Sequence, residues 1–307
     1  MSSSLIPEKL FKRPSKFARA LSSDGILAFW LLLPAGVLLL GMLLYPLITV
    51  FWSSLHTQIW IKPDLGEPFV GLNNFLELFR DGRFRSSLWT TLYLAVLTVG
   101  GSFLIGIPMA LVANLESRWR TVARVAMLLP WAMPPVFSAL MFAWMFNGEY
   151  GVFNDWLSKL GLEPQRWLTT PALAVVAMVT TTVWKTSSFV ALIVLGGLQG
   201  VPKDVLEAAE VDGATRGQSF WRVTLPLLAP ALAVALIFRT LSALQVFDIP
   251  YVLTGGGPDR VLETVGIRIY RTVFEDYDFG ASSAMCVVLF VLSLVITAFY
   301  VRRVRGE

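Results

Sequence analysis

The sequence predicts an all-α integral membrane protein with about six transmembrane helices. It also predicts a helix-turn-helix loop on the cytoplasmic side, between spans four and five. Of the 307 residues, 55% are hydrophobic and 15% are charged, against roughly 25% charged residues in a soluble domain. Long runs without charge recur along the chain, and crossing a bilayer takes about 20 apolar residues. Basic residues gather in alternate loops.

Six segments are long enough to cross a membrane. Two of them are interrupted by charge, the segment 168–201 by Lys185 and the segment 223–251 by Arg239 and Asp248. A charged side chain is costly in hydrocarbon, so we expect these three residues to face a bundle interior or water. The four segments without charge are 26–55, 88–115, 125–148 and 279–301.

Prolines fall inside several of these segments. A membrane bundle tolerates them where neighbours satisfy the freed carbonyl groups. We interpret the prolines between residues 130 and 135, in the third span, as a kink. The alternative is that they divide this span into two short pieces.

The basic residues also predict orientation. With the N-terminus inside, the inner segments hold more Lys and Arg than the outer loops, although the outer loops are longer in total. The positive-inside rule therefore predicts both termini in the cytoplasm. The first apolar run is too long for a secretory signal and lacks a small-residue cleavage site, so we expect an uncleaved span. The predicted organisation is a cytoplasmic tail (1–24), a first span with an external loop (25–87), a five-span core (88–301) that contains the loop 200–224, and a second cytoplasmic tail (302–307).

The loop 200–224 has the pattern of two short helices joined by a glycine turn. Pro202 suits the first turn of a helix, where its missing N–H is not needed. Gly213 suits the end of that helix. Thr215 and Gln218 have capping-box spacing and predict the start of a second helix.

The first of these helices combines acidic and small side chains. Ala208 and Ala209 stand between Glu207 and Glu210, and Asp212 follows. Small side chains permit the close approach of another protein surface. A helix that rests on lipid usually carries Lys or Arg on its polar face, so the acidic composition favours a protein partner over a bilayer contact.

The pattern E-A-A-x-x-D-G-A at 207–214, followed by L-P-L-L-x-P at 225–230, resembles the EAA loop of bacterial ATP-binding-cassette import permeases. More narrowly, the chain resembles the maltose/trehalose-type sugar permeases. Three further motifs carry that likeness, F-V-G-L-N-N-F at 69–75, Y-G-V-F-N at 150–154 and Y-V-L-T-G-G-G-P at 251–258.

This resemblance implies that the loop docks into a cleft on a cytoplasmic ATPase and transmits its closure to the spans. The implied coupling residues are Glu207, Ala208, Ala209, Asp212 and Gly213. The resemblance further implies a location in a bacterial or archaeal cytoplasmic membrane and an assembly with three kinds of partner. These are a second homologous permease subunit, two ATP-binding-cassette ATPase subunits and an external solute-binding protein. Two different permeases are favoured over a homodimer, and no nucleic-acid partner is expected.

The sequence contains no energy-converting or catalytic motif of its own. A phosphate loop of the form G-x-x-x-x-G-K-[ST] does not occur. The single histidine, His56, and the single cysteine, Cys286, make neither a zinc site nor a nucleophile–base pair. We therefore expect a chain that is not an enzyme and holds no metal or cofactor, with ATP used by the partner ATPase.

Two polar stripes are candidates for the substrate path. By the resemblance to maltose-type permeases, the matching positions line the sugar site. Hydroxyl-pairing groups and an aromatic face, which sugar binding requires, are both present. The first stripe contains Thr182, Lys185, Thr186 and Phe189, and the second contains Arg239, Ser242 and Val246.

The intramembrane charges have a competing, structural interpretation. Arg239 and Asp248 are nine residues apart, or about 180° around a regular helix. They can face one cavity only if the helix breaks, and each therefore has a separate partner or role. An ion pair such as Lys185 with Asp248, which fixes helix packing, is the alternative to a substrate role.

The favoured function is the permease subunit of an ATP-driven importer for a disaccharide or oligosaccharide, in which the chain forms half of the path. One alternative is an ion-coupled secondary transporter, with Asp248 and Lys185 as a charge relay. Such transporters often show internal repeats, which are not evident in this sequence, and they do not need an EAA loop. Another alternative is the same importer class for a non-sugar solute, such as a peptide or an ion.

The topology has a direct test. On a Cys286→Ala background, a cysteine at position 160 should react with a membrane-impermeant thiol reagent added outside the cell. A cysteine at position 203, in the predicted coupling loop, should react only after the membrane is opened. Labelling of residue 160 from the cytoplasm alone would overturn the predicted topology.

Overall fold

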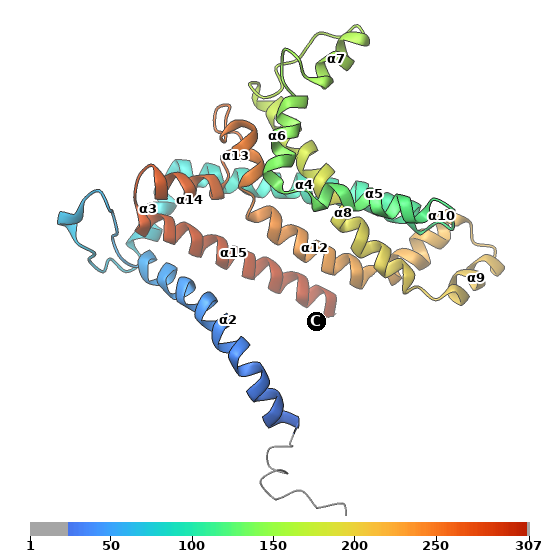
Figure 1. Cartoon of the computed structure of the whole chain (residues 1–307), viewed down its shortest axis with the longest axis horizontal. Coiled ribbons are helices and arrows are strands. Elements are labelled where there is room, and N and C mark those ends of the chain that lie inside the picture. The colour runs from blue at the N-terminus through green and yellow to red at the C-terminus, as the bar shows by residue number, and fades with distance from the viewer. Residues whose placement is uncertain (1–23, 306–307) are drawn as a thin grey trace, which may run out of the picture. The chain divides into compact units, whose positions relative to one another are not determined.

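The computed structural model describes residues 24–305, and this part of the chain is helical (Figure 1). Within it, the only strand-like pairings are two isolated bridges. The chain divides into two units, with the boundary after Trp52. The first unit contains all but the last two residues of helix α2 (Asp24–Ser54), of which the 29 residues from Ile26 have a mean hydropathy of 2.5. The predicted first span is therefore confirmed as a helix of membrane-crossing length, while nearly all of the predicted N-terminal tail lies outside the described residues.

The second unit is built on two long helices, α4 (Gly82–Asn114) and α8 (Pro171–Gln199), which share the most extensive contact in the described chain. Glycines on α4 make this approach possible. A Cβ atom added at Gly106 would lie 2.7 Å from the backbone oxygen of Ser187 and 2.8 Å from Cβ of Val190. The backbones of α4 and α8 can therefore approach this closely only because Gly106 has no side chain.

Two further helices pack beside this pair. Helix α12 (Ala229–Leu244) contacts both α4 and α8, and α15 (Phe279–Arg305) packs along α12. Helix α15 continues through Arg302 and Arg303, so the predicted 302–307 tail begins as helix, and residues 306–307 lie outside the described part. The core between these helices consists mainly of small and branched apolar side chains, such as Ala110, Val190, Val194, Leu244 and Ala284.

The third predicted span is broken into two helices, α5 (Arg120–Ala132) and α6 (Pro135–Met145), which meet at 94°. The linking residues Met133 and Pro134 are extended, with ψ of 135° and 142°. A residue that precedes a proline is driven out of the helical region, and each of these two precedes one. The predicted simple kink is therefore wrong, and the two-piece alternative is confirmed.

The fifth predicted span is also irregular. A π-helical turn at Phe220–Thr224 and the short helix α11 (Leu225–Leu227) precede α12, with a bend of 66°. Helix α12 then stops at Leu244, and Asp248 begins a separate helix, α13 (Asp248–Thr254). The segment 223–251 is thus not one regular helix, so the predicted 180° separation of Arg239 and Asp248 does not apply.

Four described helices are long and apolar enough to cross a membrane alone, namely α2, α4, α8 and α15. The number rises to six if each bent pair counts as one span. The remaining elements are short: η1 (Pro63–Leu65), α3 (Asn73–Arg80), α7 (Val152–Lys159), α9 (Lys203–Val211), α10 (Arg216–Ser219) and α14 (Val265–Phe274).

Helix α7 lies at the tip of an arm between α6 and α8 (Figure 1). The buried side chain of Asn154 closes this arm. Its amide nitrogen donates to the carbonyls of Gly148 and Gln165, and its amide oxygen accepts from the Gln165 N–H and the Trp167 indole. Asn154 ends the motif Y-G-V-F-N, whose asparagine therefore has a structural role.

The packing of α4 on α8 predicts a sharp difference between two glycines of α4. Gly106→Ala should destabilise the subunit by about 1–3 kcal/mol, because its Cβ would overlap the α8 backbone. Gly100→Ala is the matched control, since a Cβ there meets nothing within 4 Å. Thermal unfolding of the purified assembly should show a lower midpoint for the first variant only. Equal midpoints would contradict the close approach at Gly106.

Candidate functional site

A cavity of about 210 Å³ lies at the end of α12, bounded by α4, the start of α6, α8, α12 and α13. Six of the seven residues predicted for the substrate path line it. Thr182, Lys185 and Thr186 come from α8, Arg239 and Ser242 come from α12, and Val246 lies in the link that follows α12.

The seventh residue, Phe189, is not a lining residue of this cavity. Its ring lies between Trp131, with centroids 6.3 Å apart in a stacked arrangement, and Phe238, 6.3 Å away edge-on. Phe189 therefore packs α8 against α5 and α12.

The end of α12 brings Arg239 and Asp248 to the same cavity, where a continuous helix would separate them. After Leu244 the backbone leaves the helical path, and Phe247 has φ −134° and ψ −53°. The hydroxyl of Thr264 donates to the carbonyl of Val246 at 2.9 Å. This bond satisfies a carbonyl that a helix end leaves without an intrahelical partner.

Lys185 joins the cavity to the break between α5 and α6. Its Nζ donates to the carbonyl of Trp131 at 3.1 Å and to the carbonyl of Met133. These oxygens stand at the C-terminal end of α5, which carries partial negative charge and favours a cation. Across residues 24–305, Lys185 forms no ion pair with Asp248, so the structural ion pair considered above is absent from the described chain.

Arg239 is in a different situation, because it is only 3% exposed and has no counter-ion among the described residues. Its Nε and Nη2 atoms are buried and lack a hydrogen-bond partner. The cavity lining includes one carboxylate, that of Asp248, whose residue is exposed and pairs with neither cation. Positive charge thus exceeds negative charge on the wall.

Three of the four hydroxyl groups of the lining donate to backbone oxygens, while that of Thr182 donates to Met178 Sδ at 3.8 Å. Thr186 Oγ1 donates to the Thr182 carbonyl at 2.6 Å, and Ser242 Oγ donates to the Phe238 carbonyl at 2.9 Å. A hydroxyl that donates its single proton keeps lone pairs for accepting. The cavity therefore offers cationic donors and hydroxyl acceptors, which suits a ligand with both acceptor and donor oxygens.

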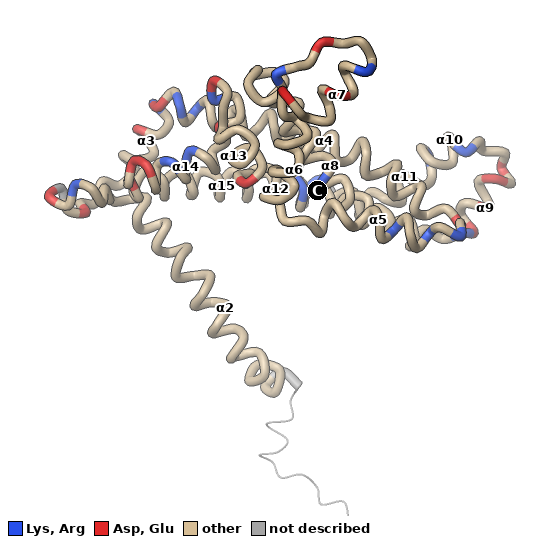
Figure 2. Tube along the Cα trace, turned by 45° about the horizontal axis from the view of Figure 1, so that its top comes forward, with Lys and Arg blue, Asp and Glu red and all other residues tan. Residues whose placement is uncertain are grey.

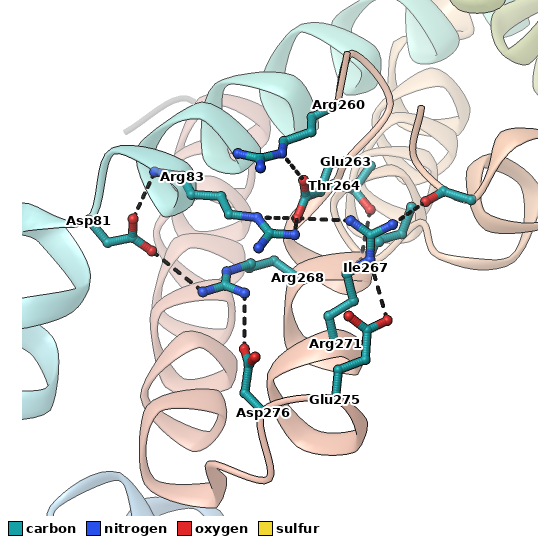
Figure 3. A network of polar contacts seen from close by, with 11 residues as sticks. Asp81, Arg83, Arg260, Glu263, Thr264, Ile267, Arg268, Arg271, Glu275 and Asp276 are labelled. Atoms are coloured by element: carbon teal, nitrogen blue, oxygen red, sulfur yellow. Dashed lines mark hydrogen bonds and ion pairs between the residues drawn. The ribbon is translucent and has the colours of Figure 1, made fainter. Parts of the chain in front are cut away.

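An ionic network with a buried centre joins the start of α4 to the segment 260–276 (Figure 3). Its centre is Glu263, which is 1% exposed. Arg83 contacts Oε1 of Glu263 through Nε at 2.9 Å and Nη2 at 2.8 Å. Arg271 lies 3.5 Å from the same oxygen, and Arg260 lies 3.8 Å from Oε2. Arg268 adds contacts with Asp81 at 3.7 Å and with Asp276 at 3.2 Å, as Figure 3 shows.

Further bonds fasten the segment around Glu263 to α4. The Tyr93 hydroxyl donates to the Val261 carbonyl at 2.5 Å, and the Val265 N–H donates to Thr91 Oγ1 at 2.9 Å. Sequence reasoning missed this network and counted its arginines only as loop charge. The available signal was the repeated arginine of the segment 260–271 around Glu263, the one glutamate of that stretch.

The predicted coupling residues lie on α9 and the turn after it. No residue of α9 is buried, and Glu207, Ala208, Asp212 and Gly213 are exposed, while Ala209 is half-buried. In Figure 2 the trace of this short helix is coloured at acidic positions, whereas the traces of the long helices are nearly free of charged positions.

The turn after α9 has the geometry that the sequence predicts. Gly213 has φ +79°, in the left-handed region, which costs other L-residues roughly 1–2 kcal/mol. The side chains and backbones of Thr215 and Gln218 form a capping box at the start of α10. Val211, beside the acids, is 86% exposed. The loop thus combines an ordered shape with an uncovered surface of mixed acidic and apolar character.

The family model described as binding-protein-dependent transport system inner membrane component matches residues 102–305. Among characterised relatives, the chain is 43% identical over 284 residues to the sulfoquinovosyl glycerol transport system permease protein SmoG of Agrobacterium fabrum, with 92% of each chain covered. It is 40% identical over 279 residues to the trehalose/maltose transport system permease protein MalF of Thermococcus litoralis, with 91% of this chain and 94% of the relative covered.

Two solved structures share the fold over most of their length. One is a bacterial ABC transporter involved in the import of the acidic polysaccharide alginate, with a TM-score of 0.81 and 26% identity over 94% of this chain and 98% of the other. The second is a bacterial alginate ABC transporter in complex with an alginate pentasaccharide-bound periplasmic protein, with a TM-score of 0.79 and 26% identity over 92% and 94% of the two chains.

The ionic network predicts a large effect from one atom exchange. Glu263→Gln removes the negative charge that the half-buried Arg83 and Arg271 and the exposed Arg260 surround. Breaking a buried ion pair costs about 3–5 kcal/mol, so the variant should lose membrane abundance and thermal stability. Asp155→Asn is the control, because its pair with Lys159 is exposed and such pairs contribute about 0–1 kcal/mol. A Glu263→Gln protein as stable as the control would show that the network does not hold the segment in place.

Proposed function

Because the chain belongs to the family of binding-protein-dependent transport system inner membrane components, we propose that it is the permease subunit of an ATP-driven sugar importer. The observation that carries the proposal is the cavity at the end of α12. It lies among the described helices that pack into a membrane-type bundle, and intramembrane charges and hydroxyls line it. An intramembrane ionisable residue marks a substrate or ion pathway by default.

The relatives support a sugar as the cargo. The names of two of them specify sulfoquinovosyl glycerol and trehalose or maltose, and the solved neighbours import alginate. The cavity has about 210 Å³, which is below the roughly 300–1,000 Å³ of complete small-molecule sites. We therefore propose that this chain supplies one half of the sugar path, with a second, homologous permease supplying the other half. A disaccharide or short oligosaccharide fits such a shared site.

The proposed attachment point of the ATPase is α9 and its glycine turn. Glu207, Ala208, Ala209, Asp212 and Gly213 form an uncovered surface that a cleft on another protein can receive. Gly213 holds the turn in a left-handed conformation. The irregular segment 220–228 connects this surface directly to α12, which carries Arg239 at the cavity. Movement of the loop can thus reach the substrate path along one continuous stretch of chain.

Membership of this family also supports a proposal for the remaining assembly. We propose two cytoplasmic ATPase subunits and an external solute-binding protein as partners, with both termini of this chain in the cytoplasm. A solved neighbour is in complex with an alginate pentasaccharide-bound periplasmic protein, which supports an external partner. The relatives are transport permeases, and we propose that this chain, too, performs no chemistry and leaves ATP hydrolysis to its partner. The charge-relay alternative loses its basis, because Lys185 bonds to α5 carbonyls and not to Asp248.

ATP-dependent uptake tests both the function and the coupling surface. The assembled importer is placed in vesicles together with its binding protein. These vesicles should accumulate labelled sugar only when ATP is present on the side of the membrane where the ATPase subunits lie. Glu207→Lys should abolish this uptake by reversing charge at the docking surface, and Gly213→Val should weaken it through backbone strain. Both variants should retain normal membrane abundance.

Glu149→Lys provides the control, since Glu149 is an exposed acid on the arm that carries α7. It should retain uptake. Full uptake and normal ATPase assembly in both loop variants would reject the docking surface. Absence of ATP-driven sugar uptake in the wild-type assembly would reject the proposed function itself.

A further inference from the structure

We propose that the sugar carried through this cavity is anionic, and that Arg239 binds its carboxylate or sulfonate group with the help of Lys185. This inference rests on the proposed function and specifies the substrate class of the same site. The shared chemistry is an oxyanion attached to a sugar ring. The structural basis is an unpaired, buried guanidinium on the wall of the cavity.

The charges that line the cavity do not balance. Lys185 and Arg239 are cationic, and Asp248 is the one carboxylate of the lining. Asp248 is exposed and forms no ion pair with either cation among residues 24–305. Burying a charge without a counter-ion is costly, so a ligand that brings the missing negative charge gains more than a neutral one.

A comparison of Arg239 with Arg83 shows that the Arg239 guanidinium lacks an acidic partner. Arg83 uses Nε and Nη2, two nitrogens on the same edge of the guanidinium, to grip Glu263. In Arg239 the corresponding two atoms are buried and have no partner. That edge is the one that holds a planar oxyanion through two parallel hydrogen bonds. The donor pair that is occupied in Arg83 is therefore vacant in Arg239.

Lys185 is already held in place and adds a second positive charge. Two of its protons bond to the carbonyls of Trp131 and Met133, and an ammonium group has three to donate. The third is available to a ligand oxygen. The hydroxyls of Thr186 and Ser242 keep acceptor capacity for the sugar ring. The site is thus divided into a cationic part for the acidic substituent and a hydroxyl part for the ring.

A neutral sugar satisfies this arrangement poorly. Its hydroxyls can accept from Arg239, but they leave the buried charge uncompensated. A site that is built for a particular polar group discriminates strongly against ligands that leave its own buried groups unpaired. Discrimination by charge at this cavity is therefore expected independently of any selection by the external binding protein.

The test uses the purified importer assembly without its binding protein, so that only the permease cavity is probed. Its thermal unfolding midpoint is measured with a disaccharide that carries one uronate carboxylate, with its 6-sulfonate counterpart, and with the neutral parent disaccharide. Sodium acetate at equal ionic strength controls for free anions. At saturating ligand, an acidic sugar should raise the midpoint by roughly 2 °C, and the neutral sugar and acetate should leave it unchanged.

Substitutions then assign the effect. Arg239→Gln should abolish the shift or weaken the apparent affinity by at least about tenfold, while Arg239→Lys, which keeps the charge and loses the fork, should retain part of it. Arg166→Gln is the control, because Arg166 is exposed and outside the cavity. A larger shift with the uronate than with the sulfonate identifies the carboxylate as the better fit, and the reverse identifies the sulfonate.

Three results would overturn the inference. These are equal shifts with neutral and acidic sugars, no shift with any of them, or an acidic shift that survives in Arg239→Gln. If any of these results is combined with ATP-driven uptake of a neutral sugar in the vesicle assay, the proposed importer function would still hold. Only the proposal of an anionic substrate would then be rejected.

Discussion

The structure depends on one carboxylate that is almost completely removed from solvent. Arg83, Arg260 and Arg271 surround Glu263, and these counter-charges offset the burial of its carboxylate, since an unpaired buried charge is strongly unfavourable. These arginines come from α4, from the loop before α14, and from α14. The neighbouring Thr264 then fixes the carbonyl of Val246, and with it the link that follows α12. Removing the charge of Glu263 would thus loosen the wall of the cavity, although Glu263 itself is not part of the lining.

Two interrupted spans build the site. In an uninterrupted helix, almost all backbone N–H and C=O groups bond to each other within the helix. A broken helix leaves carbonyl groups without an intrahelical partner, and these need donors from elsewhere. Lys185 supplies donors at the break between α5 and α6, and Thr264 supplies one after α12. The breaks therefore do more than bend the chain. They turn intramembrane polar residues toward each other and leave a space between them.

The sequence predicted the class of the fold, the four long apolar helices and the glycine turn after α9 because these depend on local properties. Apolar run length identified α2, α4, α8 and α15, and Gly213 with Thr215 and Gln218 specified the turn after α9. The predicted side chains of α8 also meet those of α12 at one cavity, except for Phe189, whose ring found aromatic partners. The helical periodicity of the sequence could not predict the end of α12. The hydroxyl of Thr264, 18 residues beyond Val246, bonds to the Val246 carbonyl in the link that follows this end. The partners of Glu263 were equally hidden, since Arg83 lies 180 residues away.

The positive wall of the cavity also bears on what the path keeps out. An import route must open toward each side of the membrane in turn, and each opening could short-circuit the ion gradients that the cell maintains. If the route passes through the cavity as proposed, Lys185 and Arg239 place positive potential on its wall, and low-dielectric walls focus such a potential. Sodium ions and protons meet an electrostatic barrier at such a point, as they do at the arginine of water-selective channels. The same two side chains would therefore limit the leakage of cations through the subunit while its cargo passes.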